Sequence, residues 1–204
     1  MKKEILKQYI LDRQEAQSKK TLFPRELKID LGFHRQTGKI AAILGSRRAG
    51  KSTYLLQLHR ALGLRKRQGI WIDFTEYLWQ DFGKEDWKTL WEVALEINTS
   101  FEPVFFLDEI QQLRDFASGL RYLQNQNCLI FITGSNSILF GKSMAESLRD
   151  KVLSYELFPL SFGEFLLFRH WQETPPFDSR QRAKLNTLLD EYLLWGGFPE
   201  VVLA

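Results

Sequence analysis

Residues 45–52 read Gly-Ser-Arg-Arg-Ala-Gly-Lys-Ser, and this stretch decides the fold of the 204-residue chain. It follows a short apolar run, residues 40–44, and precedes residues 51–62, where leucines recur at helical spacing. The pattern Gly-x-x-x-x-Gly-Lys-Ser between a strand and a helix is typical of a loop that wraps phosphate groups with its backbone N–H groups. The stretch therefore predicts a phosphate-binding loop in an α/β protein.

Each part of this loop has a chemical reason to bind a nucleotide. The helix that begins near Lys51 directs the positive end of its dipole at the anion, and the Lys51 ammonium supplies a point charge to the β- and γ-phosphates. The Ser52 hydroxyl can ligate Mg²⁺. We therefore expect ATP and Mg²⁺ as cofactors. The residues expected to bind the nucleotide are Gly45, Ser46, Arg47, Arg48, Ala49, Gly50, Lys51, Ser52 and Thr53.

Two acidic residues, Asp108 and Glu109, follow the most apolar run of the chain, residues 103–107. An uninterrupted apolar strand is typical of the centre of a parallel sheet. We expect Asp108 to hold Mg²⁺, directly or through water, opposite Ser52. Glu109 is placed to orient and polarise the attacking water, as a general base. The pair favours a hydrolase over a small-molecule kinase, and the chain has no Asn-Lys-x-Asp motif of the kind that reads guanine.

A polar stretch, residues 133–136, ends the next expected strand, residues 128–133. If that strand lies between the phosphate-loop strand and the Asp108 strand, its tip lies beside the γ-phosphate. Asn136 or Ser135 could then hydrogen-bond the attacking water or the leaving phosphate, which makes Asn136 a candidate catalytic residue. The alternative is a helix cap, because Asn and Ser are favoured at that position.

Strands and helices alternate along the chain. Five stretches read as strands: residues 40–44, 69–75, 103–107, 128–133 and 151–157. Helical patterns cover residues 2–17, 51–62, 85–98, 110–124 and 179–195. A capping box of Ser161 and Glu164 predicts another helix from Phe162. The alternation predicts a parallel α/β sheet flanked by helices, followed by a helical C-terminal segment.

The expected organisation has three parts: an N-terminal helix and linker (1–23), a nucleotide-binding domain (24–158) and a helical C-terminal segment (159–204). The apolar ending, residues 201–204, directly follows Gly196 and Gly197 and a Phe-Pro-Glu sequence. We interpret it as the mark of a truncated fragment of a longer protein. The alternative is a natural terminus that docks as a short strand.

Composition excludes several classes of protein. The apolar runs are too short to span a bilayer, and none of signal-peptide length follows the N-terminus. A single cysteine, Cys128, excludes an internal disulfide framework, and the three histidines show no metal-ligand spacing. We therefore expect a soluble cytoplasmic protein with no membrane partner.

The net charge of +3 hides an asymmetry. Residues 1–70 carry 17 Lys/Arg and 5 Asp/Glu, a charge of +12, and residues 71–204 carry 11 and 20, a charge of −9. The basic part could face polyanions such as nucleotide or nucleic acid. Alternatively, the two parts fold together and partly neutralise each other.

On these motifs the chain resembles a family of AAA+-superfamily ATPases of bacteria and archaea, in which an N-terminal ATPase domain precedes a C-terminal domain. The segments that carry the resemblance are 24–27, 45–53, 106–111, 133–136, 157–162 and 196–200. The resemblance implies a P-loop NTPase sheet of order 5-1-4-3-2 and a chain that normally continues well past residue 204. It also implies Mg²⁺-dependent ATP hydrolysis coupled to a partner. DNA, protein and a second copy of the chain are the partners left open.

One departure from the family bears on catalysis. Members often carry a Gly-Arg pair where residues 147–151 here read Ser-Leu-Arg-Asp-Lys. If that arginine completes a site in trans, its role falls to Arg149 or Lys151, or is lost, and a lysine cannot reproduce the bidentate guanidinium clamp. The alternative function is therefore a nucleotide-dependent switch with little intrinsic hydrolysis that recruits DNA or protein. A P-loop kinase is a third interpretation.

Overall fold

The computed structural model describes residues 1–18, 22–65, 67–98, 102–134, 148 and 150–203. Five strands form one sheet of order β2-β3-β4-β1-β5, and every neighbouring pair is parallel. The order is the predicted 5-1-4-3-2 and confirms the α/β fold. The strands are β1 (Ile40–Leu44), β2 (Gly69–Asp73), β3 (Val104–Asp108), β4 (Leu129–Gly134) and β5 (Val152–Glu156).

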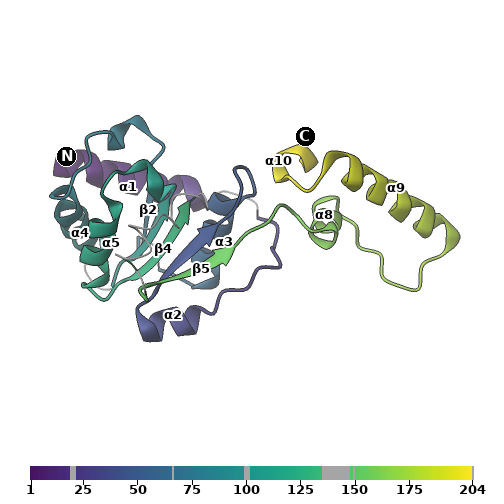
Figure 1. Ribbon diagram of the computed structural model, residues 1–204, viewed down its shortest axis with the longest axis horizontal. Coiled ribbons are helices and arrows are strands. Elements are labelled where there is room, and N and C mark those ends of the chain that lie inside the picture. The colour runs from purple at the N-terminus through teal and green to yellow at the C-terminus, as the bar shows by residue number, and fades with distance from the viewer. Residues whose placement is uncertain (19–21, 66, 99–101, 135–147, 149, 204) are drawn as a thin grey trace.

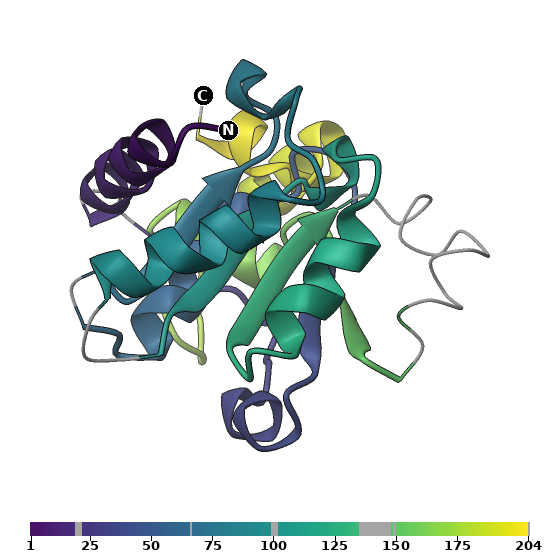
Figure 2. The same cartoon turned by 90° about the vertical axis from the view of Figure 1, so that its left-hand side faces the viewer.

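Helices cover both faces of this sheet. Among the described residues, the α-helices are α1 (Lys3–Ser18), α2 (Leu31–Thr37), α3 (Lys51–Ala61), α4 (Asp86–Ile97), α5 (Phe116–Gln124), α8 (Phe162–Phe168), α9 (Ser179–Trp195) and α10 (Pro199–Val202). The same residues include the short 3₁₀ helices η1 (Tyr77–Trp79) and η2 (Ile110–Gln112). Figure 2 shows α1, α4 and α5 side by side on one face, and α3 packs on the other.

The alternation of side chains along each strand gives the sheet two cores. In β1, Ile40 and Ala42 belong to the core under α1, α4 and α5, whereas Ala41 and Ile43 belong to the core under α3. Because β3 is covered on both faces, its apolar run is uninterrupted. The edge strand β5 has no fully buried residue, which explains its weaker pattern in the sequence.

The C-terminal helices form a small cluster of their own at the carboxyl edge of the sheet (Figure 1). Its buried residues are Leu160, Phe165, Phe168 and Val202. The predicted capping box at Ser161 and the helix over residues 179–195 are confirmed. The domain boundary between residues 158 and 159 stays a prediction. In the described part of the chain, no helix combines the length and apolarity needed to cross a lipid bilayer.

The structure differs from the sequence-based expectations at three places. The helix expected over residues 110–124 is wrong at its start: η2 is followed by an extended Leu113, and α5 begins only at Phe116. The short helix α2 was not expected. The alternative of a C-terminal strand is wrong, because residues 199–202 form α10.

Gly119 in α5 is required by close packing. A Cβ atom at this position would lie 1.9 Å from Cε2 of Trp87, which is buried in α4. We expect Gly119→Ala to lower the free energy of unfolding by about 1–3 kcal/mol, although alanine has the higher helix propensity. Urea unfolding measures the change. Arg121→Ala, at an exposed position of the same helix, is the control, and an unchanged midpoint for Gly119→Ala would contradict this packing.

Candidate functional site

The phosphate loop connects β1 to α3, as the sequence predicts. Gly50, which precedes α3, has a φ of 95°, a conformation that glycine adopts at little steric cost. At Gly45, a Cβ atom would lie 2.2 Å from the carbonyl oxygen of Leu157. Glycines at both ends therefore let the loop turn and let the chain after β5 pass close to it. The N–H groups at the start of α3 face the loop, where they can bind an anion.

Lys51 is held over the loop by backbone carbonyls. Its Nζ donates hydrogen bonds to the carbonyl oxygens of Gly45 at 3.2 Å and Ser46 at 3.0 Å. The same ammonium lies 3.6 Å from Oε1 of Glu109, and only 5% of the Lys51 side chain is exposed. A buried positive charge thus lies between the loop and the acidic pair.

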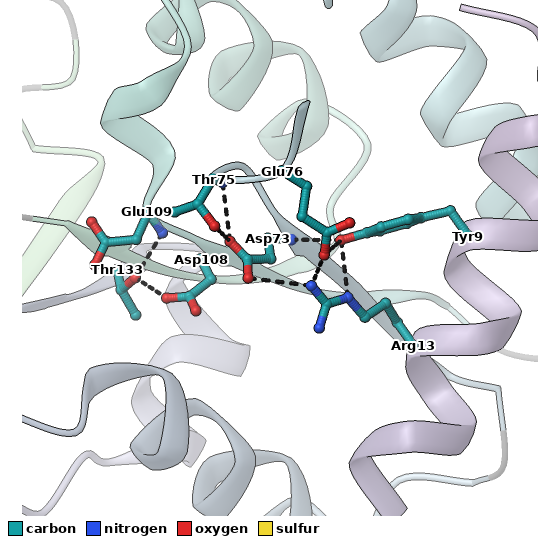
Figure 3. A network of polar contacts seen from close by, with 8 residues as sticks. All are labelled: Tyr9, Arg13, Asp73, Thr75, Glu76, Asp108, Glu109 and Thr133. Atoms are coloured by element: carbon teal, nitrogen blue, oxygen red, sulfur yellow. Dashed lines mark hydrogen bonds and ion pairs between the residues drawn. The ribbon is translucent and has the colours of Figure 1, made fainter. Parts of the chain in front are cut away.

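Thr133 of β4 connects the two acidic residues that follow one another at the end of β3 (Figure 3). Its hydroxyl donates to Oδ1 of Asp108 and accepts the backbone N–H of Glu109 at 2.9 Å. Ser52 at the start of α3 also hydrogen-bonds to Asp108. The oxygens of Ser52 and Asp108 are therefore adjacent, and hard oxygen ligands are what Mg²⁺ prefers.

The electrostatics of the acidic pair follow from burial. Burial raises the pKa of the Asp108 carboxyl above its ordinary value of 3.8. The hydrogen bonds from Ser52 and Thr133 partly offset this rise in pKa, while the nearby carboxylates of Asp73 and Glu109 add to it. A cation at this position would relieve the repulsion between the acids.

Glu109 differs from Asp108 in backbone and exposure. Its φ of 51° and ψ of 48° lie in the left-handed region, which non-glycine residues rarely adopt. Its side chain is 24% exposed, so water can reach the carboxylate. Oε2 of Glu109 accepts a hydrogen bond from the Gln111 side chain. The chain thus turns sharply after β3 and presents an accessible carboxylate beside Lys51.

Asp73 is a residue that the sequence analysis missed. It ends β2 and pairs in register with Asp108 of β3. Its Oδ2 lies 3.2 Å from Nη2 of Arg13 in α1, and its Oδ1 accepts from the Thr75 hydroxyl at 2.6 Å (Figure 3). The sequence signal that could have identified Asp73 is an acidic residue at the end of an apolar strand. The ion pair with Arg13 orients the Asp73 carboxylate toward α1.

The remaining loop residues are exposed, apart from the buried Ala49. Ser46, Arg47 and Thr53 face solvent, and Nε of Arg48 lies 3.3 Å from a carboxylate oxygen of Glu200 in α10. This contact brings the C-terminal segment to the loop.

Four further predicted residues are Ser135, Asn136, Arg149 and Lys151. Ser135, Asn136 and Arg149 lie outside the described residues. Lys151 precedes β5, and its carbonyl oxygen accepts the N–H of Ile40 at 2.8 Å, at the amino end of β1. The five residues of β1 separate it from the loop by roughly 16 Å.

An open cavity of about 690 Å³ lies beside the loop. It is bounded by the segment before α2, by the chain after β5 and by α8 and α9. Its lining residues include Arg25, Glu26, Leu27, Leu157 and Tyr192. Arg25 donates to the carbonyl oxygen of Ala49 in the loop, which shows that cavity and loop are neighbours.

The sequence of this chain is similar to a known domain family and to proteins of two other organisms. The family model described as an AAA domain matches residues 37–166. An uncharacterized protein of Methanocaldococcus jannaschii is 33% identical over 202 residues, which cover 99% of this chain and 44% of that protein. An uncharacterized protein of Haemophilus influenzae is 33% identical over 181 residues, which cover 83% and 42%. The chain thus spans less than half the length of these curated relatives.

A solved structure of Saccharomyces cerevisiae Hsp104, in its extended complex with casein, shares the fold. It aligns with a TM-score of 0.54 and 16% sequence identity. The alignment covers 95% of this chain and 38% of the Hsp104 chain. At this identity the likeness concerns the arrangement of strands and helices.

Proposed function

The chain belongs to the AAA domain family, and we propose that it binds ATP with Mg²⁺ and hydrolyses the ATP to ADP and phosphate. One observation carries the proposal. Lys51, Asp108 and Glu109 meet at the carboxyl edge of the sheet, around a loop of the phosphate-binding pattern. A phosphate clamp, a metal ligand and a base are the groups that this reaction needs.

Binding of the phosphates would use the loop and Lys51. The ammonium donates to loop carbonyls at 3.0 and 3.2 Å, and a bound β- or γ-phosphate would offer it charged acceptors in their place. Arg47 and Arg48 add positive charge at the exposed side of the loop. The neighbouring cavity has room for the base and ribose, and its apolar lining includes Leu27 and Leu157.

Ser52 and Asp108 would hold Mg²⁺, since their side chains already lie within hydrogen-bonding reach of each other. The ion would neutralise part of the charge on the phosphate oxygens. Glu109 would orient a water molecule for attack on the γ-phosphorus. The new P–O bond forms as the bond to the bridging oxygen breaks, and the water proton passes to the Glu109 carboxylate. Asn136 or Ser135 remains our candidate for contacting the γ-phosphate.

Thr133→Val tests whether the acids must be held as the structure shows. Valine has nearly the same shape but removes both hydrogen bonds of the Thr133 hydroxyl. We expect ATP turnover to fall about 10- to 100-fold, the usual cost of losing a group that orients a metal ligand. Steady-state phosphate release measures it. Thr133→Ser keeps the hydroxyl and should retain most of the activity, whereas full activity of the valine variant would contradict the assignment.

A second function, a nucleotide-dependent switch with little hydrolysis, is favoured by the position of Lys151. Because Lys151 lies at the amino edge of the sheet, it is far from the phosphates bound in the same chain. A finger from Lys151 would therefore act on the site of a second copy, and a single copy, without that charge at its own phosphates, would hydrolyse ATP slowly. Under this function the switch would recruit DNA or protein.

Calorimetric titration separates these functions. ATP with Mg²⁺, ATP with EDTA, and GTP with Mg²⁺ are each titrated into the purified chain, and phosphate release is followed in parallel with and without DNA. If the chain is an ATPase, we expect it to bind ATP more tightly with Mg²⁺ and to release phosphate. Tight binding with no turnover favours the switch. Absence of ATP binding contradicts both.

A further inference from the structure

Arg25 is a buried charge that joins three separate parts of the chain. It lies between α1 and α2 and is 8% exposed, which is rare for a charged side chain. Its Nε donates to Oε1 of Glu164 in α8 at 2.8 Å. Nη1 donates to the carbonyl oxygen of Ala49 in the phosphate loop at 2.8 Å, and Nη2 to that of Phe158 after β5 at 2.6 Å. One rigid guanidinium thus bridges the loop and the C-terminal segment.

Glu164 is held as firmly as its partner. Oε1 also accepts the backbone N–H of Glu26 at 2.6 Å, and Oε2 accepts that of Ser161 at 2.9 Å. Burial by itself raises the pKa of the Glu164 carboxyl, but the hydrogen bonds from Arg25, Glu26 and Ser161 bring it below the ordinary value of 4.5. The side chain is therefore a carboxylate at neutral pH. A buried ion pair is tolerated when its remaining hydrogen-bonding groups are satisfied in this way.

The C-terminal segment touches the loop a second time through α10. A Cβ atom on Gly50 would lie 3.3 Å from Nη1 of Arg25 and 3.6 Å from Cγ of Pro199. Nε of Arg48 pairs with Glu200 at 3.3 Å. The loop is thus in contact with Arg25 on one side and with α10 on another.

We propose that Arg25 is a positioning residue that couples the conformation of the phosphate loop to the placement of α8, and with it the rest of the C-terminal segment. The inference rests on the proposed ATP binding. When the loop closes on phosphate, its Ala49 carbonyl moves with it. A buried guanidinium N–H left unpaired is costly, so Arg25 must follow, and Glu164 with it.

The coupling works in both directions, because a coupling free energy is reciprocal. A loop closed on ATP favours the placement of α8 in which Arg25 keeps its hydrogen bonds to Ala49 and Glu164. A partner that displaces α8 would in turn weaken ATP binding. The Arg25 contacts would thus link the affinity for ATP to the binding of a partner at the C-terminal segment.

Hydrogen–deuterium exchange with ATP and Mg²⁺ tests the coupling on the full chain. Glu164→Gln keeps the shape of the side chain but places an amide where Arg25 and the Glu26 N–H both donate. Arg25→Lys keeps the charge but loses the fork that reaches three acceptors. Glu191→Gln is the matched control: it removes an ion pair with Arg169 inside the same C-terminal segment.

In the unaltered chain we expect ATP to slow exchange in residues 45–52 and also in α8. In Glu164→Gln and Arg25→Lys, ATP should still protect the loop while the protection of α8 is lost, and ATP affinity should fall by about 5-fold or more. Glu191→Gln should keep both effects.

Two results contradict the account in different ways. Equal ATP protection of α8 in the unaltered chain and in both variants would show that Arg25 has only a structural role. Absence of ATP binding to the unaltered chain would contradict the proposed function itself, and this inference with it.

Discussion

Replacing Glu109 by glutamine should reduce ATP turnover by about 10²- to 10⁴-fold, the range that a general base contributes. Glutamine has the same shape but cannot take the proton from the attacking water. The Glu109 side chain is partly exposed, and Lys51 keeps its hydrogen bonds to the carbonyl oxygens of Gly45 and Ser46, so we expect the loop to stay in place. ATP affinity should therefore change only a few-fold. Phosphate release measures the first effect and calorimetric titration the second.

Glu92→Gln is the matched control for this variant. Glu92 lies on the exposed face of α4, away from the loop, and should tolerate the same chemical change with unaltered turnover. If Glu109→Gln also releases phosphate at the unaltered rate, Glu109 is not the base. A large loss of ATP affinity would instead indicate that its pairing with Lys51 shapes the loop.

Replacing Lys51 by methionine should weaken ATP binding and lower turnover by about 10²- to 10³-fold or more, the cost of removing a preorganised charge from a developing anion. Methionine preserves most of the chain length and can remain between the loop and β3. Lys51 is buried and lies between the loop and Glu109, so its removal takes a charge directly from the expected phosphate position. Titration with ATP and Mg²⁺ gives the loss of affinity directly.

Lys88→Met provides the comparison, since Lys88 is an exposed lysine on α4. It should bind ATP as the unaltered chain does. Wild-type ATP affinity in Lys51→Met would contradict the assignment of residues 45–52 as the phosphate site. Urea unfolding of both variants separates lost binding from lost folding.

The central strands and the loop could be predicted because their residues carry strong local signals. The apolar run of β3 follows from burial on both faces, and Gly45 and Gly50 follow from the geometry of the loop. The strand order came from the family resemblance. Helix α2 was missed because seven residues are too few for a periodic pattern, although Asp30 caps it and Gly38 ends it in the left-handed region.

Tertiary packing decided what the local signals could not. The helix expected from residue 110 is interrupted because Leu113 is extended and buried in the core. The contact of Arg25 with Glu164 joins residues 139 positions apart, which no spacing in the sequence reveals. The role of Thr133 depends on the register of β4 beside β3. Capping boxes, by contrast, are local, and the one at Ser161 could be predicted.

Phosphate release from ATP by the purified chain, with Mg²⁺ or with EDTA, tests the central claim most directly. We predict release that requires Mg²⁺ and falls toward the EDTA rate in Glu109→Gln. No Mg²⁺-dependent release by the unaltered chain, or equal release by the variant, would contradict ATP hydrolysis at this site.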